Sequence, residues 1–123
     1  MQALKASGVP VISMKEFLEW KLGSRQLPAK CVMITIDDGW KSVYTDAYPI
    51  LKETGFPFIV FPYTKFITGR GSAMSHDQIQ EMLDNGATLG SHSVSHLYPK
   101  SWRAAQRKGA QGVLDLAEAE IAA

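Results

Sequence analysis

The feature that most limits the fold of this chain is an alternation of short apolar runs with amphipathic helical patterns. Apolar runs occupy residues 31–36, 58–61 and 87–89. Helical patterns precede, separate and follow them, over residues 13–22, 43–54, 75–84 and 101–121. Strands that alternate with helices pair in parallel through right-handed crossovers. The sequence therefore predicts an α/β fold with a parallel sheet, and the apolar first run indicates a strand covered on both faces.

Local signals define several helix boundaries. Ser13 with Glu16, and Ser75 with Gln78, have the spacing of capping boxes, in which the first side chain accepts from the helix and the second returns to the cap. Pro49 lies inside the second helical pattern, where a missing N–H predicts an irregular first turn or a kink. The last pattern, over residues 101–121, predicts one helix.

Three further residues are expected to pack in the core. Trp20 and Trp102 fall on apolar helix faces, and Cys31 begins an apolar run. A single cysteine excludes an internal disulfide and a cysteine-rich zinc site. Its position favours a small core residue over a reactive thiol.

Length and charge limit the domain count and the partners. With 123 residues, 46% of them hydrophobic, the chain is large enough for one core and one domain, residues 1–123. A formal net charge of +1 gives no indication of a nucleic acid or an anionic membrane as a partner. No apolar stretch approaches the roughly 18 residues of a transmembrane segment, and residues 1–8 lack the profile of a signal peptide.

Two adjacent carboxylates, Asp37 and Asp38, directly follow the first apolar run. Like charges so close repel unless something neutralises them. A turn or a helix N-cap explains the pair equally well when it is considered without the rest of the sequence. Because successive side chains of an extended backbone point to opposite sides, one aspartate can bind a cation while the other stays free as a base.

Two histidines, His92 and His96, follow the third apolar run and are four residues apart. In parallel sheets the C-terminal ends of the strands meet at one edge, where chemistry collects. The topology thus brings the histidines and the aspartates together, and two histidines with one carboxylate are a common open zinc site. His76 begins a predicted helix and is interpreted as a surface residue.

These motifs resemble those of the polysaccharide deacetylases, the NodB-homology domain of carbohydrate esterase family four. Ile-Thr-Ile-Asp-Asp-Gly at residues 34–39 is similar to the first signature of that family, T-F-D-D-G. Ser-His-Ser-Val-Ser-His at residues 91–96 is similar to the second, H-[ST]-x-x-H. The stretch from residue 47 to residue 55 also fits. The lead-in at residues 11–13 and 27–28 resembles the subgroup that acts on poly-N-acetylglucosamine.

The resemblance implies a role for each matching residue. Asp37 corresponds to the general base, and Asp38, His92 and His96 correspond to the ligands of a divalent metal, most often zinc, with cobalt or nickel as substitutes. The implied activity is metal-dependent hydrolysis of N-acetyl groups on a polysaccharide, in a bacterial extracytoplasmic or cell-envelope setting. The implied fold is a distorted (β/α) barrel.

Two aromatic residues near these motifs are candidates for substrate binding. Trp40 directly follows the Asp-Asp-Gly turn. It either stacks on a sugar ring or lies in the core or the rim of the site. Tyr63 follows the second apolar run, and a backbone N–H near it is a candidate for stabilising the reaction's oxyanion.

Nothing after His96 matches the later signatures of the family, which contain an Arg-Pro pair and a histidine that serves as general acid. Single α/β barrels commonly have about 200–250 residues. We therefore expect the N-terminal part of a truncated barrel, or a chain completed by a homo-oligomer or by a second chain.

Two alternative functions follow from other classes. A truncated metal- or sugar-binding pseudo-enzyme without turnover is consistent with the missing signatures. A phosphotransferase that forms an aspartyl phosphate also has an aspartate after a buried strand. Such enzymes need carboxylates at alternate positions, whereas Asp37 and Asp38 are adjacent and Gly39 follows.

Overall fold

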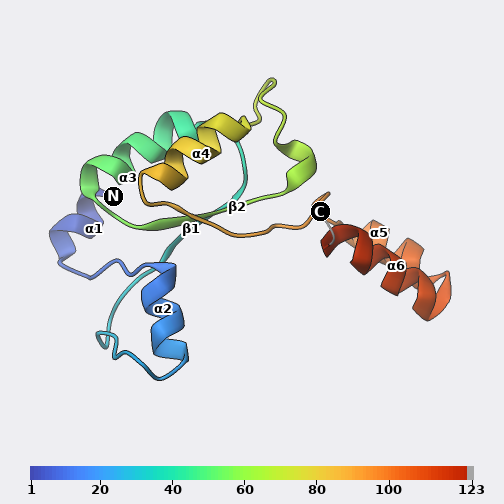
Figure 1. Cartoon of the computed structure of the whole chain (residues 1–123), viewed down its shortest axis with the longest axis horizontal. Helices are drawn as coiled ribbons and strands as arrows, with labels where there is room; N and C mark the ends of the chain where they lie inside the picture. Colours follow the sequence, from blue (N-terminus) through green and yellow to red (C-terminus); the bar gives the residue numbers. More distant parts are fainter. Residues whose placement is uncertain (122–123) are drawn as a thin grey trace.

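The computed structural model describes residues 1–121, and its centre is a parallel three-stranded sheet (Figure 1). The strands are β1 (Ile34–Asp38), β2 (Phe58–Pro62) and β3 (Thr88–Leu89), in the order β1-β2-β3. Asp37 pairs with Phe61 and Asp38 with Pro62. The predicted parallel sheet is confirmed. The strand β1 begins later than residue 31 and includes both aspartates.

Helices connect and flank the strands. They are α1 (Gln2–Ser7), α2 (Met14–Lys21), the π-helical turn η1 (Val43–Ala47), α3 (Tyr48–Thr54), the 3₁₀ turn η2 (Thr64–Phe66), α4 (His76–Asp84), α5 (Pro99–Gln106) and α6 (Gly109–Ile121). The irregular turn predicted near Pro49 is confirmed, because η1 directly precedes α3 and Pro49 lies in the first turn of α3. No helix within residues 1–121 is long and apolar enough to cross a membrane.

The core lies between the sheet and the helices α3 and α4, which cover one of its faces (Figure 1). Leu51 of α3, Val60 of β2 and Met82 of α4 are each at most 1% exposed. Met74, just before α4, is fully buried beside them. This packing fixes the positions of the strands and therefore of their C-terminal ends.

The prediction that the first strand is covered on both faces is wrong. Along β1, Ile34 and Ile36 are half-buried and pack against the core, whereas Thr35 and Asp37 are exposed. The reason is that α3 and α4 cover only one face, and successive side chains of β1 alternate between that face and the other.

Two core predictions and one helix prediction are also wrong. Trp20 is 46% exposed and Trp102 is 38% exposed, so both lie at the surface. The expected helix over residues 101–121 is two helices, α5 and α6, which pack against each other. The chain turns at Gly109, whose φ of +81° is a left-handed conformation that suits glycine. Cys31 is half-buried.

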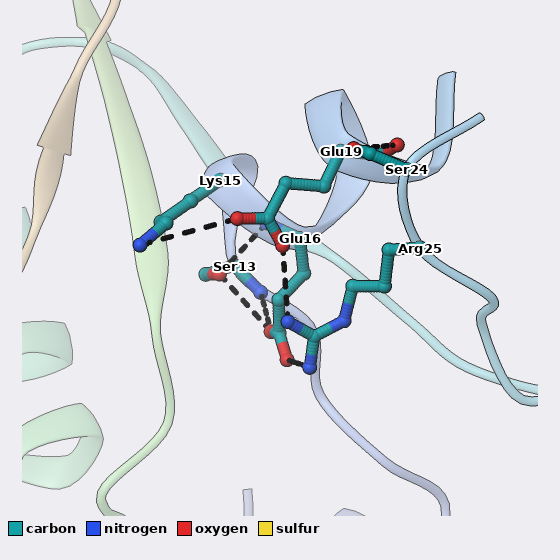
Figure 2. Close-up of polar contacts among 6 residues, drawn as sticks. All are labelled: Ser13, Lys15, Glu16, Glu19, Ser24 and Arg25. Atoms are coloured by element: carbon teal, nitrogen blue, oxygen red, sulfur yellow. Dashed lines mark hydrogen bonds and ion pairs between the residues drawn. The ribbon is translucent and has the colours of Figure 1, made fainter. Parts of the chain in front are cut away.

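Polar contacts at both ends of α2 stabilise this helix (Figure 2). The hydroxyl of Ser13 accepts from the Glu16 N–H, and a Glu16 oxygen accepts from the Ser13 N–H at 2.8 Å, which confirms the predicted capping box. Arg25 reaches back to Glu16 at 2.7 Å and to Glu19 at 3.1 Å. The Ser13 N–H, the Ser13 hydroxyl and the Arg25 charge lower the pKa of Glu16. The second box, at Ser75 and the start of α4, is confirmed as well.

Candidate metal centre

A tight turn at the end of β1 places Asp38. The Gly39 N–H donates to the Asp37 carbonyl at 2.9 Å, so the chain reverses around Asp38, whose φ is +72°. A positive φ at a non-glycine residue is uncommon, and such conformations collect at functional sites. Glycine suits the next position, because its φ of +94° is a conformation that other residues rarely adopt and a Cβ on Gly39 would also meet Ile67 Cδ1 at 2.4 Å. The Met74 N–H donates to the Gly39 carbonyl at 3.0 Å and holds the turn in place.

Residues 91–96 form the segment that we call the histidine loop. Its backbone is bonded to the end of β2 and to η2. The His92 N–H donates to the Pro62 carbonyl at 3.2 Å, and the Lys65 N–H donates to the Val94 carbonyl at 3.0 Å. Within the loop, the His96 N–H donates to the Ser93 hydroxyl at 3.1 Å. His92 and His96 therefore face the same strand end that carries Asp38.

The structure brings together the three residues predicted as metal ligands. Asp38 Oδ1 lies 3.4 Å from His92 Nε2 and 3.4 Å from His96 Nε2. This oxygen is buried and has no hydrogen-bond partner within residues 1–121. The other oxygen, Oδ2, accepts from the Trp40 indole N–H at 3.1 Å. One carboxylate oxygen is thus held by Trp40, and the other is directed at both imidazoles.

The three side chains could hold a single metal ion, because their ligand atoms all lie within 4.8 Å of one another. Zinc binds nitrogen and oxygen at about 2.0–2.1 Å in tetrahedral geometry, which separates neighbouring ligand atoms by about 3.3–3.4 Å. The separations of Asp38 Oδ1 from the two Nε2 atoms, 3.4 Å each, have this value. Within the described part of the chain, Asp38, His92 and His96 form the one cluster of three potential metal ligands. A buried, unpaired carboxylate oxygen is costly, and a cation at this point would satisfy it.

The predicted base, Asp37, lies beside this group and not in it. Asp37 is exposed on β1, whereas Asp38 is half-buried. The predicted surface histidine, His76, is exposed at the first residue of α4.

Comparisons with known proteins identify the family. The family model for polysaccharide deacetylases matches residues 24–112. The chain belongs to the polysaccharide deacetylase family. It is 34% identical over 97 residues to a putative polysaccharide deacetylase, YxkH, of Bacillus subtilis, a match that covers 79% of this chain and 34% of that protein.

A second curated relative and a solved structure are also similar to this chain. The chain is 33% identical over 64 residues to the poly-beta-1,6-N-acetyl-D-glucosamine N-deacetylase of Escherichia coli, covering 52% of this chain and 10% of that protein. The structure of IcaB from Ammonifex degensii superimposes with a TM-score of 0.71 and 30% identity, covering 94% of this chain and 57% of that one. The deacetylase fold expected from the motifs is therefore confirmed. This chain spans about a third of the Bacillus subtilis relative and just over half of the IcaB structure.

An aromatic row borders the group formed by Asp38, His92 and His96. Trp40 packs edge-on against Phe66 with ring centroids 4.8 Å apart, and Phe66 stacks on Tyr63 at 5.0 Å. The ring centroids of Tyr63 and His96 lie 5.5 Å apart. Tyr98 ends the row, with its ring centroid 5.1 Å from that of His96. Burial raises the pKa of Tyr63, with smaller contributions from Tyr98 and Asp38, so its phenol stays neutral.

One residue of the site was missed by sequence reasoning. Glu120 of α6 is only 8% exposed, and its carboxylate accepts from the N–H and the hydroxyl of Ser95 in the histidine loop. The Ser95 hydroxyl makes the largest contribution to lowering the pKa of Glu120. A signal was present in the sequence. Leu116 and Ala117 precede Glu120 by four and three residues, which places this acid on the apolar face of its helix.

Proposed function

We propose that this chain binds zinc through Asp38, His92 and His96 and removes N-acetyl groups from an N-acetylglucosamine polymer. The observation that carries the proposal is the buried Asp38 Oδ1, which has no hydrogen-bond partner in the described residues and lies 3.4 Å from both imidazole nitrogens. Cobalt or nickel would suit the same nitrogen and oxygen ligands.

The chain's own groups divide the work between binding and proton transfer. Trp40 holds Asp38 Oδ2 and so directs Oδ1 to the metal position. When bound, the zinc ion would supply a Lewis acid that polarises the N-acetyl carbonyl and lowers the pKa of water. Asp37, exposed on the neighbouring position of β1, is assigned the role of general base. It accepts the proton of the water that attacks the acetyl carbon.

The aromatic row gives the substrate a surface on which to bind. Trp40 is 44% exposed and Tyr98 is 64% exposed, which leaves ring faces available beside the ligands. Sugar rings present apolar C–H faces that pack on aromatic side chains. Tyr63 is half-buried with its ring between those of Phe66 and His96, and we assign it to the wall of the acetyl pocket. The polymer class is suggested by the Escherichia coli relative, whose name specifies poly-beta-1,6-N-acetyl-D-glucosamine.

The amine leaving group needs a proton, and the donor is assigned to no residue of this chain. No histidine follows His96, and His76 lies at the start of α4. Metal binding and turnover are therefore separate questions. The alternative of a pseudo-enzyme without turnover finds no support in the comparisons, where the relatives are described as deacetylases. A cell-envelope location and a partner chain stay predictions.

Zinc titration of the metal-free protein by calorimetry tests the binding site. We expect one zinc per chain in the wild type. The combined His92→Ala and His96→Ala variant should bind none. His76→Ala is the matched control, because this histidine is exposed and lies outside the site. Failure of the wild type to bind zinc, or retention of zinc by the double variant, would reject the site.

Release of acetate from N-acetylglucosamine oligomers tests the reaction. The zinc-loaded wild type should release acetate, and Asp37→Asn should lose this activity while it still binds zinc. This variant keeps the size of the side chain and removes the base. If Asp37→Asn released acetate at the wild-type rate, Asp37 would not be the base. A zinc-loaded wild type without acetate release would reject deacetylation by this chain.

A further inference from the structure

Glu120 connects the C-terminal helix α6 to the histidine loop. Of the charged side chains in residues 1–121, it alone is buried. Its Oε2 accepts from the Ser95 N–H at 2.7 Å, and its Oε1 accepts from the Ser95 hydroxyl at 2.5 Å. Both carboxylate oxygens therefore contact one residue, and that residue directly precedes the ligand His96.

The histidine loop has a backbone that needs such support. Ser93 and His96 have φ values of +68° and +53°, which are left-handed conformations. Each such non-glycine residue costs free energy and persists only when its surroundings hold it. Two internal bonds, from the Ser93 N–H to the Ser91 hydroxyl and from the His96 N–H to the Ser93 hydroxyl, close the loop on itself. The Glu120 carboxylate then holds Ser95, between these two left-handed residues.

Packing on this side of the loop leaves space. A hollow of about 690 Å³ is lined by His92, His96, Trp102, Ala117 and Glu120, among others. Side-chain contacts with α5 and α6 therefore do not fill the region behind the imidazoles. The hydrogen bonds of Glu120 are the directional link between α6 and the loop.

We propose that Glu120 is a positioning residue for the metal site, which acts by fixing Ser95 and through it the backbone of His96. The inference rests on the proposed zinc binding of Asp38, His92 and His96. Groups that orient metal ligands from outside the coordination shell typically change metal affinity by about 10–100-fold when removed. We expect an effect of that size for Glu120.

Four variants of the 123-residue chain separate positioning from other roles. Glu120→Ala removes both bonds to Ser95. Glu120→Gln is the conservative variant, because its amide oxygen can accept from the Ser95 N–H while its NH₂ donates to the Ser95 hydroxyl oxygen. Ser95→Ala removes only the hydroxyl bond. Glu118→Ala is the matched control, since Glu118 is exposed on the same helix.

Zinc affinity is measured by competition with a chelator, at a temperature where circular dichroism shows each metal-free variant to be folded. Glu120→Ala should weaken zinc binding by about 10–100-fold, and Ser95→Ala by about 3–10-fold. Glu120→Gln should stay near wild type, and Glu118→Ala should match it. The visible absorption of bound Co²⁺, which reports ligand geometry, should change in Glu120→Ala and not in Glu118→Ala.

The outcomes distinguish this inference from the proposed function. Wild-type affinity in both Glu120→Ala and Ser95→Ala would overturn the inference and leave zinc binding intact. An equal loss of zinc affinity in Glu120→Gln and Glu120→Ala would show that the charge of Glu120 matters and the geometry of its hydrogen bonds does not. That result would also overturn the inference. A wild-type protein without affinity for zinc would refute the proposed function itself.

Discussion

Gly90 is a position where one methyl group should disturb the sheet next to the metal site. A Cβ on Gly90 would lie 2.1 Å from Phe61 Cε1 and 2.3 Å from Phe61 Cδ1. Ordinary contacts between carbon atoms are about 3.5–4.0 Å, so the ring would have to retreat by more than about 1 Å. A retreat of the Gly90 backbone would instead stretch the hydrogen bond from its N–H to the Val60 carbonyl, now 2.9 Å long.

The cost of Gly90→Ala follows from this overlap. Inserting a methyl group into a packed region costs about 1–3 kcal/mol. No penalty for a left-handed backbone adds to it, because Gly90 is not among the glycines with positive φ. In a chain of this size, 1 kcal/mol lowers Tm by about 3–6 °C. Urea unfolding followed by circular dichroism measures the free energy directly.

A double-mutant cycle tests whether Phe61 causes the loss. In a Phe61→Ala background the ring is absent, so Gly90→Ala should cost close to nothing there. Gly86→Ala is the control. Gly86 has open space around it and a φ of +93°, so its substitution should cost about 1–2 kcal/mol in both backgrounds. The same cost for Gly90→Ala with and without the Phe61 ring would refute the steric argument.

Three further predictions test the core, a helix and the site. Leu51→Ala should lower the free energy of unfolding by about 2–5 kcal/mol in urea titrations, because Leu51 is 1% exposed and its loss leaves a cavity. Glu16→Gln should unfold at a lower urea concentration than wild type at pH 7. That difference should close as the pH falls below 4.5. The pKa of Glu16 is lower in the folded protein than its ordinary value of 4.5, so its ionised carboxylate stabilises the fold above pH 4.5. This stabilisation is lost as the pH falls through the folded-state pKa and the carboxylate is protonated. Trp40→Phe keeps an aromatic ring but loses the N–H bonded to Asp38, so zinc affinity measured by chelator competition should fall by about tenfold.

Sequence patterns predicted the sheet because its signals are local. A short apolar run between two helices leaves few alternatives to a parallel strand, and β1, β2 and β3 all lie at or near the predicted runs. Capping boxes at Ser13 and Ser75 located two helix starts for the same reason. Tertiary context decided the rest. Trp20 lies on an apolar helix face, yet it is 46% exposed because side-chain pattern does not specify what covers that face.

The sequence predicted the candidate ligands of the site, but not the backbone conformations and the hydrogen bonds that hold them in place. His92, His96 and Asp38 were identified because each follows an apolar run that predicts a strand, and the C-terminal ends of parallel strands meet at one sheet edge. The left-handed conformations at Asp38 and His96 have only a weak residue signal, since aspartate and histidine adopt them more often than most residues but far less often than glycine. Glu120 was missed because the contact with Ser95 spans 25 positions in the sequence. It also depends on the break between α5 and α6.

The two adjacent aspartates owe their different environments to the register of β1. Asp37 pairs with Phe61 and Asp38 with Pro62, so the strand places Asp37 on the exposed face and turns the chain at Asp38. Because side chains alternate with a period of two, a slip of one residue would exchange the two faces. Asp37 would then point to the half-buried side, and the turn would begin one position away from Gly39, whose φ of +94° favours glycine and where a Cβ would meet Ile67. The steric demand at Gly39 and the apolar pairing of β1 with β2 therefore select the same register. That register directs Asp38 at the two histidines and leaves Asp37 accessible to water.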